Sequence, residues 1–227
     1  MRTIKLVTVV ALTLACVAAQ GQNTFFPTKA GMILLYAHQD DKGKVDSYTR
    51  HTFKNVEGSG SNLTISYVVE AFDKNMKPQG SEIPCTVVIK DDVVILDMNE
   101  MFVDQQKVSD IKVEITGAPM ELPGNLQPGQ SLKDANMTMT MEMGIIKMRT
   151  DIKVTDIKCE AIEDVTVQAG TFTCHKVTQT VTTTVMRRDL VGTTVTWYAP
   201  NIGTVKSETY NNKNKLTGRM ELASLEN

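Results

Sequence analysis

Histidine is scarce in this sequence, and no catalytic pattern surrounds the few that occur. The 227 residues include three histidines, at His38, His51 and His175. None of them is part of a nucleophile elbow or of an HExxH pair, the local patterns that mark a serine hydrolase or a zinc site. The doublets Asp40-Asp41 and Asp91-Asp92 could pair carboxylates, but each lies in a predicted turn, where solvated charge is the ordinary explanation. We therefore expect no enzymatic activity, no cofactor and no metal.

Basic charge is not in excess either. The chain carries 24 lysines and arginines against 26 aspartates and glutamates. Two of the basic residues, Arg2 and Lys5, lie in an N-terminal segment that we expect to be removed, which leaves a formal charge of −4. A mildly acidic surface argues against a nucleic-acid partner.

The chain has an apolar run at its start that is too short for a membrane-spanning helix. This run, Leu6 to Ala19, follows the two basic residues and ends in small residues that suit a signal peptidase. We expect residues 1–21 to be a signal peptide and residues 22–227 to form a single β domain. The protein is then exported to the periplasm or the outer membrane. Lipidation of Cys16 is the alternative to simple cleavage, but the leucine usual three residues before such a cysteine is missing, so a soluble product is favoured.

Cysteine is also rare. After the signal peptide only Cys85, Cys159 and Cys174 remain, and an oxidising compartment permits one bridge and leaves one thiol over. Because Cys159 and Cys174 bracket a loop around Gly170, we predict a disulfide between them. The alternative is that all three are small buried apolar residues. Their spacing does not suggest zinc.

An alternation of apolar and polar residues runs through most of the chain. It is clear in Leu63 to Ala71 and in Val177 to Val185, where the period of two is typical of strands with one buried face. The pattern predicts an all-β fold: a strongly curved antiparallel sheet of about ten to twelve strands, shaped as a half-open barrel, because a flat sheet this wide would leave long edges. A change of phase between Val154 and Ile157 predicts a β-bulge near Thr155.

One stretch, Asp97 to Asp104, breaks the strand rhythm. Asp97 and Glu100 have the spacing of a capping box, and Met98, Met101 and Phe102 share one face of a helix. We expect one short helix at the concave face of the sheet.

The run Asn136 to Gly144 reads NMTMTMEMG and has methionine at every second position. A strand there places the methionines on one face and the threonines and glutamate on the other. Flexible thioethers facing the predicted helix would suit a hydrophobic ligand such as a lipid or an acyl chain. The candidate ligand-binding residues are Met137, Met139, Met141, Met143, Met98, Met101 and Phe102.

Two other interpretations of the methionine run stay open. The side chains could be plain core that fills irregular space beneath the helix. They could also present several sulfur atoms to Cu(I), although no histidine lies nearby in the sequence and the stripe is flat.

The last third of the chain resembles a known group of proteins. The segments EDVTVQAGTFTCHKV (residues 163–177) and TWYAPNIGTVKSETYNNKNKL (residues 196–216) are similar to the C-terminal signature of a TapB-like family of exported β-proteins from the Bacteroides group. That family is similar in shape to the half-barrel lipoprotein carriers LolA and LolB. The resemblance covers residues 160–225 and implies the half-barrel fold but no catalytic residues.

These observations together predict a non-enzymatic protein of the periplasm or outer membrane that binds or carries a hydrophobic ligand. A membrane surface is a further candidate partner. The alternative is a structural or protein-interaction module with a filled core and no ligand. Polar or charged side chains pointing into the concavity beside the methionines would favour the ligand.

Overall fold

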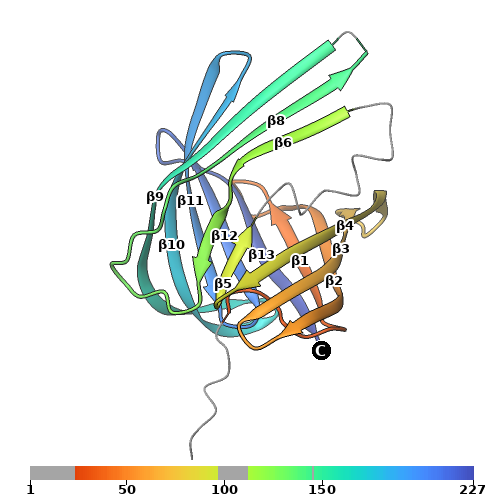
Figure 1. Ribbon diagram of the computed structural model, residues 1–227, viewed down its shortest axis with the longest axis vertical. Coiled ribbons are helices and arrows are strands. Elements are labelled where there is room, and N and C mark those ends of the chain that lie inside the picture. The colour runs from red at the N-terminus through yellow and green to blue at the C-terminus, as the bar shows by residue number, and fades with distance from the viewer. Residues whose placement is uncertain (1–23, 97–111, 145) are drawn as a thin grey trace, which may run out of the picture.

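The computed structural model describes residues 24–96, 112–144 and 146–227. Within these residues every regular element is a strand, and thirteen strands form one antiparallel sheet that curves into a nearly closed barrel (Figure 1). The expected all-β fold is confirmed, with more strands than expected. The additional strand is β7 (Met120–Pro123), which the prolines at 119 and 123 had suggested to be loop. Proline is tolerated there because β7 is an edge strand with one unpaired side.

The strands differ widely in length, from four residues in β5 and β7 to 22 in β9. Their bounds are β1 (Ile33–Gln39), β2 (Val45–Ser59), β3 (Asn62–Asp73), β4 (Pro78–Lys90), β5 (Val93–Leu96), β6 (Lys112–Ala118), β7 (Met120–Pro123), β8 (Ala135–Met143), β9 (Ile146–Val167), β10 (Gly170–Val185), β11 (Arg188–Ala199), β12 (Gly203–Asn211) and β13 (Leu216–Glu226).

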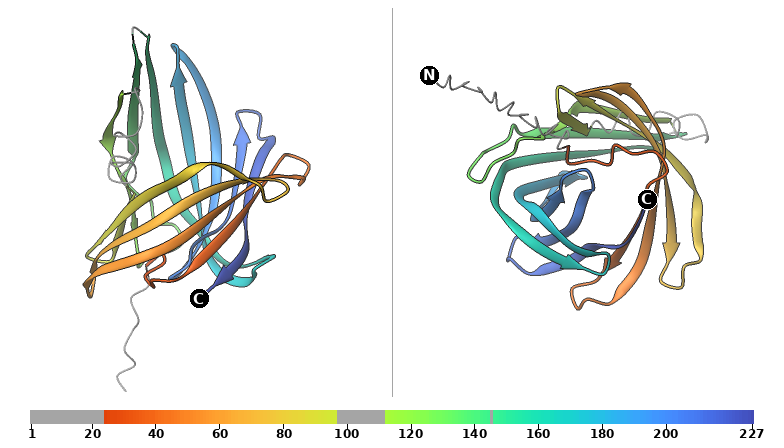
Figure 2. Two further views of the ribbon diagram at one scale, coloured as in Figure 1. Left: turned by 90° about the vertical axis from the view of Figure 1, so that its right-hand side faces the viewer. Right: turned by 90° about the horizontal axis from the view of Figure 1, so that it is seen from below.

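The order of strands across the sheet explains its shape. It runs β6-β8-β9-β10-β11-β12-β13-β1-β2-β3-β4-β5-β7, so the first and last strands of the chain pair side by side. The two edges of the sheet are β6 and β7, which are consecutive in the chain with only Pro119 between them. Seen from below, the sheet therefore winds round almost to its own beginning (Figure 2).

The predicted bulge near Thr155 is confirmed. Thr155 pairs with Thr180 and Lys158 pairs with Thr178, so Asp156 and Ile157 together stand opposite one residue of β10. Asp156 adopts a φ of 54°, a left-handed conformation that aspartate tolerates better than most residues. The extra residue lets side chains before and after the bulge face the same core.

A short segment after the predicted signal peptide fills the lower end of the barrel. Phe25 packs edge to face against His175 at 4.7 Å between ring centroids, and Phe26 packs against Phe53 and Tyr67 at 5.6 and 5.7 Å. Phe25 is 2% exposed. The lower barrel is therefore a closed aromatic core.

The expected helix over residues 97–104 lies outside the described residues, and so does the predicted signal peptide. Within the described ranges, no helix is long and apolar enough to cross a membrane.

The predicted disulfide is wrong, because Cys85, Cys159 and Cys174 are all free and buried. Cys174 pairs with Glu163, whereas Cys159 pairs with Val177. Cys159 lies four positions before Glu163 on β9, which is about 13 Å along a strand. A disulfide needs Cα atoms within about 7 Å, so the strand register excludes it.

We therefore predict three protected thiols in the exported protein. Burial, with smaller contributions from Asp164 and Glu163, raises the pKa of the Cys174 thiol to about 12, so its reactive thiolate is absent at neutral pH. Iodoacetamide should leave all three cysteines unmodified in the native protein and modify all three in denaturant, as read by mass spectrometry. Non-reducing peptide mapping that finds Cys159 linked to Cys174 would contradict the strand register.

Candidate functional site

Three of the candidate methionines lie together on one face of β8. Met137, Met139 and Met141 occupy alternate positions and are half-buried. Their partners across the neighbouring strands are mostly apolar. Those partners are Gly117, Ile115 and Val113 on β6, and Ile152, Thr150 and Met148 on β9. We call this set of nine residues the methionine face.

The methionine face continues the core-facing side of the sheet. Ile152 pairs with Met137, and Val154 lies two residues further along β9, so both side chains point to the same side. Val154 packs against the buried core. The methionines therefore point to the concave side of the sheet, above the closed aromatic core.

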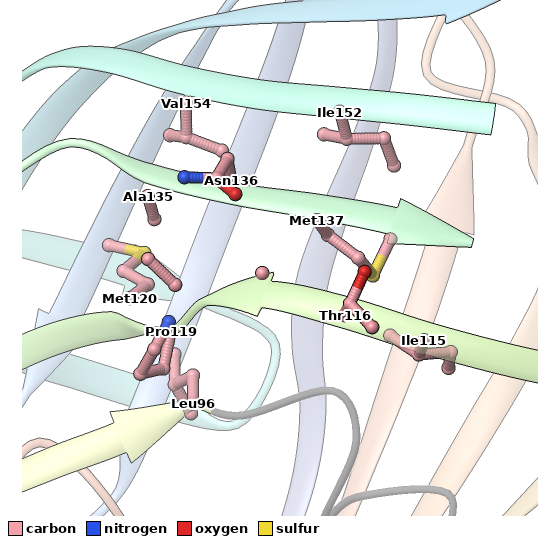
Figure 3. A pocket seen from close by; sticks show the side chains of 12 residues that line it. Leu96, Ile115, Thr116, Pro119, Met120, Ala135, Asn136, Met137, Ile152 and Val154 are labelled. Carbon is pink, nitrogen blue, oxygen red and sulfur yellow. The ribbon is translucent and has the colours of Figure 1, made fainter.

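A pocket of about 320 Å³ lies where the methionine face meets the other edge of the sheet. Figure 3 shows Met137, Ile152 and Val154 on the side of β8 and β9, with Leu96 and Met120 on the other side. The lining is almost wholly apolar. We call this cavity the seam pocket.

The seam pocket exists because the two edges of the sheet do not pair. In the described structure β6 pairs with β8 and β7 pairs with β5, so only the chain through Pro119 joins them. Proline has no N–H to donate at this position. Side chains rather than backbone hydrogen bonds therefore occupy the space between the edges.

The structure brings together only part of the predicted site. Met137 lines the seam pocket, and Met139 and Met141 extend the same face away from it. Met143 belongs to β8, but its side chain lies outside the described set. Met98, Met101 and Phe102 also lie outside the described residues.

Nothing in the sequence pattern indicated that two of the residues would line the pocket. Leu96 and Met120 meet Met137 only because β5 and β7 form the second edge of the sheet. Ile152 and Val154, in contrast, are in phase with the methionines along the neighbouring strand, so the periodicity does indicate them.

A buried polar group lies on the same concave side. Gln179 of β10 shares a face with Val181, which pairs with Val154 of the seam pocket. The Oε1 atom of Gln179 is buried and accepts no hydrogen bond within the described structure. A buried acceptor without a partner costs about 1–3 kcal/mol, so this position favours an additional donor.

The outer face of the same strands is charged and internally paired. Asp151 accepts hydrogen bonds from Arg149 and from the Thr138 hydroxyl, the latter at 2.6 Å. These hydrogen bonds lower the pKa of Asp151 to about 2. Lys147 pairs with Glu142 at 2.7 Å. The wall formed by β8 and β9 is thus mostly apolar on its concave side and polar, with two ion pairs, on its outer side.

The closed lower barrel holds a second, smaller cavity of about 130 Å³. It is lined mainly by aromatic rings, including Tyr36, His51, Tyr67 and Tyr198. Burial raises the pKa of Tyr198 to about 12. Burial, with a smaller contribution from His38, lowers the pKa of His51 to about 4. Elsewhere too, no three His, Cys, Asp or Glu side chains of the described residues gather to hold a metal ion.

Comparison with known proteins identifies relatives of this fold. The family model described as DUF3108-like matches residues 29–222. A Bacteroides fragilis protein, presumed to be exported and with a YmcC-like fold, is similar over 90% of this chain and 100% of its own, with 22% identity and a TM-score of 0.72. A presumed lipoprotein from Parabacteroides distasonis covers 90% of this chain and 99% of its own, with 21% identity and a TM-score of 0.73. No curated protein matches the chain.

The lowered pKa of His51 predicts a pH-dependent stability. In the unfolded chain histidine titrates near 6.5, so between about pH 6.5 and 4 the unfolded state binds more protons than the folded state. Stability is fully present above that window and is lost as the pH falls through it, by about 3 kcal/mol from this residue.

The measurement is denaturant unfolding of the wild type and of His51→Gln at several pH values. Because His38 and His175 also have lowered pKa values, the relevant quantity is the difference in slope between the two proteins. Parallel pH profiles would show that His51 is protonated as readily in the folded state as in the unfolded state.

Proposed function

Since the matching model spans most of its length, the chain belongs to the DUF3108-like family, and we propose that it binds or carries a hydrophobic ligand without catalysing a reaction. The ligand class is a lipid or another molecule with an acyl chain. The seam pocket, which the methionine face extends, is the observation that carries this proposal.

The size and chemistry of the seam pocket support a ligand rather than solvent. Its volume of about 320 Å³ lies in the range of small-molecule sites, which are mostly apolar with a few placed polar groups. Each buried methylene contributes about 0.8 kcal/mol, so six would contribute about 5 kcal/mol before the costs of ordering. Half-buried thioethers adapt readily to a flexible chain.

The unpaired Oε1 atom of Gln179 supports an amphiphilic ligand. Gln179 is two residues from Val181, the β10 partner of the pocket residue Val154. A hydroxyl or amide N–H on a ligand that extends from the pocket to this position would satisfy the oxygen. The aromatic core leaves the lower barrel only the smaller cavity of about 130 Å³. The ligand therefore occupies the upper, seam side of the concavity.

Export to the periplasm or outer membrane is part of the proposal. It rests on the signal-peptide pattern of residues 1–21 and is supported by similar structures of a presumed exported protein and a presumed lipoprotein. Because the second similar structure is of a presumed lipoprotein, lipidation of Cys16 stays the alternative to a soluble product. We also propose that the protein is similar to the TapB-like proteins and to the LolA and LolB carriers. The apolar concave side of β8 and β9 supports this similarity.

The first functional test exchanges Met139 and Met141 for threonine. The mature protein from its own host should carry extractable lipid in native mass spectrometry, and the double variant should not. Because Met139 and Met141 are only half-buried, the new hydroxyls can meet water on a concave face without ligand, so the melting temperature should change little. Met76→Asn, which alters an exposed methionine in a left-handed turn that asparagine tolerates, is the control and should keep its lipid.

The opposite pattern supports the interaction-module alternative. In that case native mass spectrometry gives the wild-type protein the mass of its sequence alone, and the extracts contain no lipid. The double variant then melts at a clearly lower temperature. These results together would show that the methionines fill a dry core.

The second test replaces Gln179 by leucine. This change removes the unpaired buried oxygen, so the protein without ligand should gain about 1 kcal/mol of unfolding free energy. The same variant should retain less of a ligand that has a hydroxyl or amide donor, while its affinity for a plain fatty chain should stay the same. A variant that loses stability and binds both ligands as well as the wild type would show that Gln179 plays no part in ligand binding.

A further inference from the structure

The turn between β10 and β11 exposes apolar side chains to an unusual degree. Met186 is 79% exposed and Leu190 is 67% exposed, the highest values among the large apolar side chains of the described residues. Val191 follows at 44%. We call the segment Met186 to Val191 the hairpin tip.

The backbone of the hairpin tip is also unfavourable for its residues. Val185 pairs with Arg188, so Met186 and Arg187 form a two-residue turn, and their φ values are 50° and 62°. Such a turn favours Asn-Gly, because two successive residues must be left-handed. The equivalent turn between β4 and β5 uses Asp91 and Asp92, a residue type that tolerates this conformation better. A methionine at the apex is therefore unfavourable in two ways: its backbone is left-handed and its apolar side chain is exposed to water. Unfavourable residues of this kind are often kept for function.

The hairpin tip is also basic. Arg187 and Arg188 are exposed, and neither belongs to an ion pair among the described residues. The only acidic residue of the tip, Asp189, accepts a hydrogen bond from the Thr184 hydroxyl at 2.6 Å. The two arginines therefore lie between Met186 and Leu190, and with Asp189 they give the tip a net charge of +1.

The hairpin tip projects at the open end of the barrel. Figures 1 and 2 show the β10–β11 and β8–β9 hairpins rising together at the end opposite the C-terminus. A shallow groove of about 290 Å³ joins the two hairpins and contains Met148, Lys147 and Met186. Met148 is 38% exposed, so it adds to the same apolar surface.

We propose that the hairpin tip docks on an anionic lipid surface, with Met186 and Leu190 entering the headgroup region and Arg187 and Arg188 contacting phosphates. The apolar side chains can bury surface among the lipid headgroups, and the adjacent arginines are attracted to the anionic phosphates. The acidic charge of the whole chain does not oppose this contact, because salt screens charges beyond about 8–10 Å.

The shape of the hairpin tip favours lipid over a protein partner. A stable protein interface buries about 800 Å² on each side, and a two-residue turn with a few exposed side chains offers much less. A bilayer accepts a narrow convex wedge without a matching groove. The proposal goes beyond ligand binding and holds whether or not the seam pocket contains a ligand.

Vesicle flotation of the chain without its signal peptide tests the proposal. Phosphatidylethanolamine vesicles that contain phosphatidylglycerol should carry the protein upward, and added salt should release most of it. Vesicles of phosphatidylcholine alone should bind it more weakly, by about fivefold for each arginine.

The decisive variant is Met186→Asn with Arg187→Gly, which supplies the residues that this turn prefers. The variant should melt at a higher temperature than the wild type, so lost binding cannot be ascribed to misfolding. Its partition to anionic vesicles should fall roughly fiftyfold, through loss of one charge and one inserted side chain. Met76→Asn is the matched control, because Met76 is also exposed and left-handed, at a φ of 61°.

Three outcomes would overturn the proposal: no flotation of the wild type, equal flotation of the tip variant, or an equal loss in Met76→Asn. Equal flotation of the tip variant would mean that another part of the protein contacts the membrane. No flotation of the wild type would mean that the tip binds a protein partner instead of lipid. The Met139→Thr, Met141→Thr variant should float like the wild type, which separates failure of docking from failure of ligand binding.

Discussion

The structure depends on the way in which one sheet almost closes on itself. The backbone hydrogen bonds run without interruption from β6 round to β7, and these two edges meet only through Pro119. An open sheet of this width would expose two long edges. Bringing the edges together hides them but leaves a strip where no ladder forms, and apolar side chains must line that strip. The seam pocket is thus a direct result of the topology.

Unequal strand lengths then divide the molecule into a closed part and an open part. The four residues of β5 extend over about 13 Å, whereas the 22 residues of β9 reach about 70 Å. Where short and long strands are all present, the sheet is nearly closed and residues such as Val94 and Ile157 are buried. Beyond the short strands, no strand of the described residues lies opposite the long ones, so in that part of the structure their concave face is half-exposed and their tips project.

The sequence predicts the parts of this structure that depend on local periodicity. Alternation of period two indicates the strands, and the loss of phase after Val154 indicates the bulge at Asp156. The disulfide failed because it depends on register. The turn at Gly170 pairs that residue with Val167 and therefore Cys174 with Glu163, so Cys159 is too far along the strand. Leu96 and Met120 could not be assigned to the pocket, because only the three-dimensional meeting of two edges brings them there.

Ligand binding at the seam pocket and membrane docking at the hairpin tip both involve the concave side of the wall formed by β8 and β9. Met141 pairs with Met148 near the open end, Met139 pairs with Thr150, and Met137 pairs with Ile152 at the seam pocket. These rows follow one another at about 7 Å, so the path from the hairpin tip to the pocket is apolar for most of its length. Under the two proposals, a hydrocarbon chain that leaves a bilayer at the tip would meet mostly apolar side chains on its way to the pocket. The outer face of the same strands is polar and carries two ion pairs, so it offers no such path.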